Sequence, residues 1–298
     1  MAITEKIRNS VSQFYNLPLE RFEYTYGSST LDKELQIFTP GQAFVRVMRG
    51  CNNFCTYCIV PYVRGPEVSR PPQAIIEQIK KLADKGVKQV TLLGQRINAY
   101  KYTAGQKIYC LADLLYMVSD IEGIKWIKFI TSYPSIEFFD EIMKAMANSP
   151  KVCPYLHIPA QSGSDKILKA MNRNYTAKEY LDLLDKARSI VPDIAIAGDF
   201  IVGFPGETKE DFQATVELVK KARYKNCFVF KYSPRPGTIA DKRLEDDVPL
   251  EVKKQRNYEL LRMQEKISDE LSRQFLSKTV EVLSLIHISE PTRLGMIS

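Results

Sequence analysis

Six apolar segments alternate with amphipathic segments along most of this 298-residue chain. The predicted strands cover residues 43–48, 87–94, 126–130, 152–158, 194–202 and 227–232. Apolar residues at helical spacing predict helices over residues 72–84, 111–118, 136–146, 165–171, 177–190 and 208–222. Consecutive strand-then-helix units imply parallel strands joined by right-handed crossovers. The fold class is therefore α/β. Because a closed barrel of this kind needs eight units, six indicate an open or partial barrel.

Composition places the chain among ordinary globular proteins, with 45% hydrophobic and 26% charged residues. No run of about eighteen apolar residues predicts a membrane span, and no charged-then-apolar leader opens the chain. We therefore expect a cytoplasmic protein with reduced thiols and no membrane association. The net charge of +7 is compatible with a polyanionic partner such as RNA.

Half of the six cysteines lie in one short loop after the first predicted strand, namely Cys51, Cys55 and Cys58. Iron–sulfur clusters are held by cysteine thiolates that converge from a short segment. Three ligands would leave one iron of a 4Fe-4S cube open to another molecule. A structural zinc site normally needs four ligands, and no second Cys or His pair lies nearby. The spacing favours a cluster over a zinc knuckle or three ordinary thiols.

Unusual loops follow four of the other predicted strands. Glycine, proline or small polar residues occur at 94–95, 161–164, 203–208 and 233–238. The carboxyl ends of parallel strands share one edge of a sheet, and ligands bind there. One such loop would be a plain turn, but several beside a cluster loop predict a common site.

The Cys-x3-Cys-x2-Cys loop, with Tyr57 before its last cysteine, resembles the radical SAM superfamily. The resemblance implies that Cys51, Cys55 and Cys58 hold a 4Fe-4S cluster whose open iron binds S-adenosylmethionine. An electron from the cluster then cleaves the sulfonium to a 5′-deoxyadenosyl radical. The resemblance also implies a set of cofactor-binding residues, with Tyr57 near the adenine: Tyr57, Gly94, Gln95, Gln161 and Gly203. No catalytic residue beyond the cluster ligands is predicted.

A closer resemblance is to the methylthiotransferases, in residues 50–71. Residues 92–100, 157–176 and 230–238 are similar to the MiaB-type tRNA enzymes of that family. This implies addition of a methylthio group to C2 of N6-isopentenyladenosine next to the anticodon. Relatives that modify a ribosomal protein, the first alternative, usually carry histidine where Ser162 stands and lack the ending at 235–238. A catalytically incomplete RNA-binding fragment is the second alternative.

The family also implies partners and roles for other residues. We expect a tRNA substrate, an electron donor that the sequence does not identify, and a monomer. Arg64, Glu67 and Arg70 match the family's post-cluster loop, where they either order that loop or touch substrate. His157 is interpreted as a hydrogen-bonded residue of the barrel interior rather than a ligand.

The predicted domains depart from the family pattern at both ends. Residues 1–41 are expected to be a linker or the tail of an N-terminal domain, and 42–276 the radical SAM core. Residues 277–283 are expected to start a TRAM domain, beginning with a strand, and 284–298 resemble a translated sequencing adapter. A helix over 252–276 is interpreted as solvated rather than RNA-binding. A second, auxiliary 4Fe-4S cluster is expected only in a full-length parent, so this chain should not complete sulfur transfer alone. Three further cysteines are interpreted as packing residues: Cys110, Cys153 and Cys227.

Overall fold

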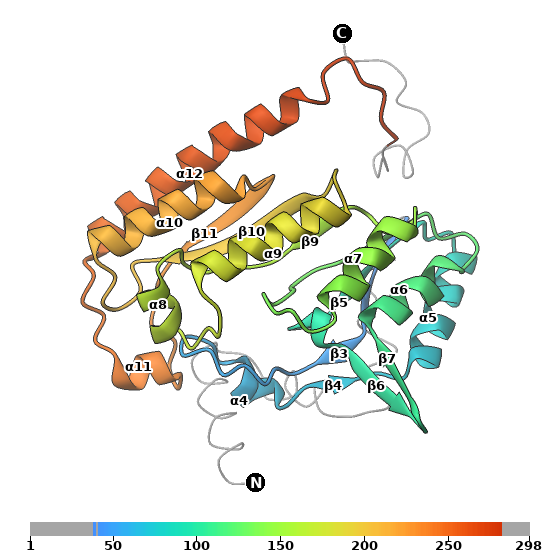
Figure 1. The fold of residues 1–298 in the computed structure, drawn as a ribbon. Helices are drawn as coiled ribbons and strands as arrows, with labels where there is room; N and C mark the ends of the chain where they lie inside the picture. Colours follow the sequence, from blue (N-terminus) through green and yellow to red (C-terminus); the bar gives the residue numbers. More distant parts are fainter. Residues whose placement is uncertain (1–37, 40, 282–298) are drawn as a thin grey trace.

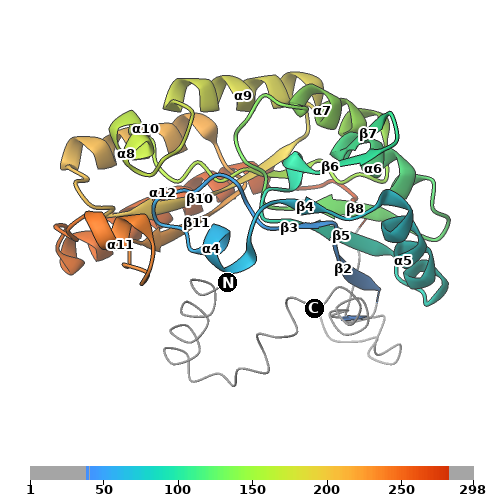
Figure 2. The same cartoon turned by 90° about the horizontal axis from the view of Figure 1, so that it is seen from below.

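A computed structural model describes residues 38–39 and 41–281 of the chain. Its main strands are β2 (Gln42–Arg46), β5 (Gln89–Leu93), β8 (Trp126–Phe129), β9 (Tyr155–His157), β10 (Ala195–Val202) and β11 (Asn226–Lys231). β2, β5 and β8 pair in parallel, and so do β9, β10 and β11. A parallel bridge between Ile127 and Val152 joins the two groups. The six strands form a curved row with helices along its outer side (Figure 2). The predicted partial barrel is confirmed.

The helices that connect the strands lie along the outer side of this row (Figure 1), and most of them bury apolar residues in the main core. They are α5 (Pro72–Asp84), α6 (Leu111–Ser119), α7 (Phe139–Asn148), α8 (Asp165–Ala170), α9 (Ala177–Ile190) and α10 (Lys209–Ala222). A long last helix, α12 (Leu250–Arg273), lies beside α10 and contacts β11. α9 begins at a capping box in which Thr176 and Glu179 satisfy each other's backbone amides.

Side chains alternate between the two faces of each strand. On β5 and β8 the helix-facing residues are fully buried, as Val90, Leu92 and Ile127 are. The residues that alternate with these point to the inside of the barrel. On β10 and β9 the inward-pointing residues include Asp199 and His157. The hydrophobic core therefore lies between strands and helices and leaves polar residues on the inner face.

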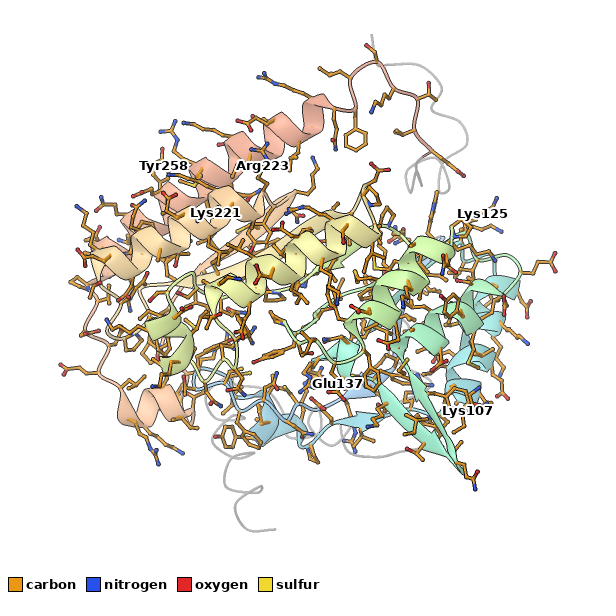
Figure 3. All side chains as sticks on the ribbon, in the orientation of Figure 1. Lys107, Lys125, Glu137, Lys221, Arg223 and Tyr258 are labelled. Atoms are coloured by element: carbon orange, nitrogen blue, oxygen red, sulfur yellow. The ribbon has the colours of Figure 1, made fainter. Side chains whose placement is uncertain are left out.

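Several short elements complete the fold and were not predicted. They are β1 (Phe38–Thr39), β3 (Met48–Arg49), α4 (Val60–Arg64), β4 (Val68–Ser69), η1 (Ile97–Ala99), β6 (Lys101–Ala104), β7 (Lys107–Cys110) and α11 (Ile239–Arg243). β6 and β7 form a hairpin that turns at Gly105, whose φ is +59°. Lys107 lies near the projecting end of that hairpin (Figure 3).

Some predicted bounds were wrong. The fourth strand is reduced to Tyr155–His157, because Pro154 has no N–H for the sheet. α7 starts at Phe139 rather than 136, after Phe138 in the left-handed region at φ +55°. The last helix ends at Arg273, and residues 278–281 form no strand where one was expected.

Other predictions lie outside the described residues, namely the structure of 1–37 and 282–298. The predicted domain boundaries therefore remain predictions. Within the described residues, no helix is long and apolar enough to cross a membrane.

Candidate functional site

The cysteine loop connects β3 to α4 and is tightly turned. Gly50 has φ +77°, and a Cβ there would overlap the carbonyl oxygen of Pro66, so only glycine fits. The Cys51 amide donates to the Gly65 carbonyl at 3.2 Å, and the Cys58 amide donates to the Cys55 carbonyl at 2.9 Å. The backbone thus places all three thiols on one compact loop.

Glu67 holds the first half of this loop. Its carboxylate accepts from the Asn52 amide at 3.3 Å, and its own amide donates to the Asn52 side chain at 3.2 Å. Arg96 reaches both parts, with 3.5 Å to the Glu67 carboxylate and 2.9 Å to Asn53 Oδ1. Glu67 therefore orders the loop.

The two arginines predicted with Glu67 are placed differently. The Arg70 guanidinium donates to the Arg46 carbonyl at 2.6 Å and to Gln78 Oε1 at 2.8 Å, so it joins the post-cluster loop to the barrel. Arg64 is exposed on the last turn of α4. Of the two predicted roles, ordering fits Glu67 and Arg70.

The end of α8 and the segment after it, residues 170–175 and called the 170–175 connector below, hold the second half of the cysteine loop. Thr56 donates its amide to the Met171 carbonyl at 3.0 Å and its hydroxyl to the Ala170 carbonyl at 2.9 Å. The Asn172 side-chain amide donates to the carbonyls of Asn53 and Phe54, both at 3.1 Å. A segment more than 110 residues away in sequence therefore fixes the loop.

Arg173, in the same connector, carries its charge into the interior beside a thiol. Its guanidinium donates to Pro159 O at 2.8 Å, to the Tyr175 hydroxyl at 2.8 Å and toward Cys55 Sγ at 3.6 Å. It also lies 4.4 Å from the Tyr133 ring centroid. Among its described partners there is no carboxylate, so its charge faces a thiol and tyrosine side chains instead. Sequence reasoning missed Arg173, since no local pattern marks this contact.

Burial is the main cause that raises the pKa of the Cys51 and Cys58 thiols, and the neighbouring thiols add to it. Burial also raises the pKa of the Tyr57 hydroxyl, which Arg173 opposes. Burial therefore disfavours the free thiolates at Cys51 and Cys58, and a bound metal cation would supply the positive charge that a thiolate needs.

Within the described residues, no three His, Cys, Asp or Glu side chains converge on a single metal ion. A cluster differs from one ion because each thiolate binds a separate iron, so its ligands stand further apart. Three thiols on a rigid loop, with a buried cation against one of them, fit such a group.

The predicted cofactor-binding residues differ in their surroundings. Gln95 has a buried Oε1 that lacks a hydrogen-bond partner among the described residues, as expected of a group that awaits a ligand. Gln161 is in the left-handed region at φ +70°. Gly94 and Gly203 differ, because a Cβ at either would overlap the side chain of Met48 or Lys253 respectively. Their small size accommodates packing, and the assignment of the cofactor pocket stays a prediction.

Two of the strand-end loops are tied together by Asp211 of α10. Its carboxylate accepts from Ser164 Oγ at 2.7 Å, from Lys166 Nζ at 2.8 Å and from the Thr208 amide at 2.9 Å. Ser164 in turn caps α8. The loops at 161–164 and 203–208 are therefore one rigid rim.

Both ring nitrogens of His157 have hydrogen-bond partners inside the barrel, as predicted. Its Nδ1 accepts from the Thr131 amide at 3.2 Å, and its Nε2 lies 3.1 Å from Asp199 Oδ1. Both ring nitrogens are used, so His157 is not available as a metal ligand.

The fold and the three-thiol loop match one protein class. The family model of the radical SAM superfamily matches residues 45–219, and the chain belongs to that superfamily. Coproporphyrinogen III oxidase from Escherichia coli, a radical SAM enzyme, superimposes with a TM-score of 0.52 at 18% identity, over 83% of this chain and 56% of that one. Methylornithine synthase superimposes with a TM-score of 0.52 at 15% identity, over 86% and 73%.

Relatives of higher sequence identity carry one enzyme name within that superfamily. The chain is 51% identical over 242 residues to the tRNA-2-methylthio-N(6)-dimethylallyladenosine synthase of Thermoanaerobacter sp. strain X514, over 81% of this chain and 51% of that protein. It is 46% identical over 245 residues to the protein of that name from Rhodopirellula baltica, over 82% and 51%. The chain spans about half the length of these relatives.

Proposed function

We propose that this chain is the radical-generating core of a tRNA methylthiotransferase that acts on C2 of N6-dimethylallyladenosine. Cys51, Cys55 and Cys58 would hold the 4Fe-4S cluster, which when bound supplies the electron that cleaves S-adenosylmethionine. Supporting this, all three thiols lie on one loop that Glu67 and the 170–175 connector hold rigid. Identity of 46–51% to the relatives named above supports the substrate.

The chain's own residues would orient the cofactor and exclude water from it. Tyr57, partly buried against the apolar cluster that contains Phe204 and Tyr232, is proposed to lie near the adenine. Gln95 and Gln161 would contribute polar contacts, while Gly94 and Gly203 would allow the rim to pack closely. Such shielding is the usual contribution of a protein to cofactor chemistry. A reduced, cytoplasmic setting with a separate electron donor would suit this chemistry.

The first experiment tests the cluster. Anaerobic reconstitution should give about four irons per chain, by the three-thiolate cube. It should also support dithionite-dependent formation of 5′-deoxyadenosine. Cys55→Ala should abolish both, and Cys110→Ala, the matched control outside the loop, should change neither. Zinc in place of iron would contradict the proposal.

The second experiment tests the substrate. Formation of 5′-deoxyadenosine should be stimulated more by tRNA that carries N6-dimethylallyladenosine than by the same tRNA with adenosine. Equal rates with both tRNAs, or stimulation by ribosomes instead, would contradict the proposed substrate and leave the cluster assignment intact.

A further inference from the structure

An aromatic wall lies on the inner face of the barrel, and the chemistry proposed above gives it no role. The register of β10 and β11 sets Asp199 beside Phe228 and Ile201 beside Phe230. The alternation of side chains puts these residues on one face. The His157 ring confirms which face it is, because it contacts Asp199 and lies edge-on to Phe228 at 6.5 Å between ring centroids.

This wall is open at one end and joins the cluster loop at the other. The Phe228 and Phe230 side chains are 51% and 54% exposed, which is unusual for aromatic residues on neighbouring inner positions of a strand. Two residues further on, Tyr232 is buried with its ring edge-on to Phe204, in an apolar cluster against which Tyr57 of the cluster loop also packs. The wall therefore extends along β11 toward the apolar cluster that also holds Tyr57 of the cysteine loop.

A hydrogen-bond acceptor stands beside the wall. Because His157 Nδ1 accepts from the Thr131 amide, the ring proton lies on Nε2 and is donated to Asp199 Oδ1. The hydrogen bonds of the described residues leave Asp199 Oδ2 without a donor, and the side chain is 22% exposed. A carboxylate on the inner face, held through its Oδ1, therefore lies beside Phe228 and one pair of residues from Phe230.

We infer that Asp199, Phe228 and Phe230 form the site that recognises the N6 side of the modified adenine. N6-dimethylallyladenosine keeps one N6–H, which Asp199 Oδ2 accepts, and carries a five-carbon apolar group, which packs on the two phenyl rings. C2 and C6 flank N1 in adenine, so a ring with C2 toward the cluster loop carries its N6 substituent along the wall. This inference rests on the proposed function and assigns its substrate specificity to named residues.

The test measures a preference, so that a general loss of RNA binding is separated from a loss of specificity. Fluorescence anisotropy with the reconstituted chain compares two labelled anticodon stem-loops, one with N6-dimethylallyladenosine and one with adenosine. The parent should favour the modified RNA about tenfold or more, as apolar pockets do for an added alkyl group. The double variant Phe228→Ala/Phe230→Ala should bind both equally, with affinity for the unmodified RNA unchanged.

Two controls guard against misfolding. Phe228→Leu/Phe230→Leu keeps apolar volume and should keep most of the preference. Phe275→Ala removes a phenyl ring that is 49% exposed beyond the end of α12 and should keep all of it. A full preference in the double alanine variant would overturn the inference.

A change in the RNA alone tests Asp199. A stem-loop with N6-methyl-N6-dimethylallyladenosine retains the alkyl group but has no N6–H, and the parent should bind it about tenfold more weakly, as expected for a lost bond to a charged group. Equal binding would overturn the role of Asp199. If the parent binds modified and unmodified RNA equally, the wall assignment fails while the proposed function stands. Binding of neither RNA would contradict both.

Discussion

Arg173 is the residue whose replacement should most weaken iron binding without removing a predicted ligand. Arg173→Met leaves the buried Cys55 sulfur without its hydrogen-bonding cation, so iron affinity should fall about ten- to a hundredfold, as for other groups that orient metal ligands. Iron bound per chain at limiting iron measures this. Arg188→Met, which removes a bond to the Ala222 carbonyl on the helical side, is the matched control. Equal iron in the two variants would contradict the role of Arg173.

At the same scale, sequence singled out the three cysteines as candidate ligands but not the residues that surround them. The three cysteines were predictable because their spacing is local. The contact between Arg173 and Cys55 was not, because it spans 118 residues and depends on the whole barrel. Gly94 and Gly203 could be singled out from the sequence because each lies at the end of a predicted strand. Their closest neighbours, Met48 and Lys253, became visible only with the packing.

Among the elements, the rim that joins α8 to α10 depends on the Asp211 carboxylate. Desolvation opposes its ionisation, but hydrogen bonds from Lys166, Ser164 and Thr208 outweigh this and lower its pKa. Asp211→Asn should therefore cost about 1–3 kcal/mol of unfolding free energy at pH 7. Because the folded pKa lies below the unfolded value of about 3.9, the stabilisation is full above that pH and is lost as the pH falls further.

Urea unfolding of the parent and Asp211→Asn at pH 7 and near pH 3 measures that difference. The gap between the two proteins should shrink at the lower pH. Asp182→Asn is the control. Asp182 pairs with Lys178 on the surface of α9, and because both side chains are more than half exposed, this pair contributes little to the free energy of unfolding. A gap independent of pH would show that the hydrogen bonds of Asp211 do not need its charge.

Elements with a clear period were predicted well, and elements without one were missed. α5 and α9 were predicted to the residue, because each has an apolar stripe and a clear start. The β6–β7 hairpin was missed because its strands are short, mostly exposed and lack strong alternation. The fourth strand was overpredicted because Pro154 interrupts an otherwise apolar run.

For the whole molecule, the cluster loop belongs to the first half of the barrel but is held by the second. Thr56 donates to Met171 after α8, and its carbonyl accepts from the Ala240 amide of α11 at 2.8 Å. Among the described residues, the β-bridge between the strands of the two halves is Ile127 to Val152, and beyond β8 the Ser132 amide donates to the His157 carbonyl at 3.0 Å. The loop therefore adds a further connection across the barrel, and cluster assembly should stabilise the whole core.

A buried ion pair joins α12 to the loop at 203–208. Arg256 Nη1 lies 3.3 Å from Glu207 Oε2, and the two side chains are 11% and 2% exposed. Burial raises the pKa of Glu207, which Arg256 opposes. Arg256→Met leaves that carboxylate without a cation and should cost about 3–5 kcal/mol of unfolding free energy at pH 7.

The pH dependence separates loss of charge from loss of packing. A folded pKa above the unfolded value of about 4.3 means that the fold gains stability as the pH falls toward 4 and Glu207 is protonated, so the defect of Arg256→Met should shrink there. Glu207→Gln/Arg256→Met, which removes both charges, should recover much of the stability at pH 7. Urea unfolding of the parent and both variants at pH 7 and pH 4.5 measures this. If the double variant is as unstable as Arg256→Met at both pH values, then packing of the arginine stem holds α12 and the ion pair does not.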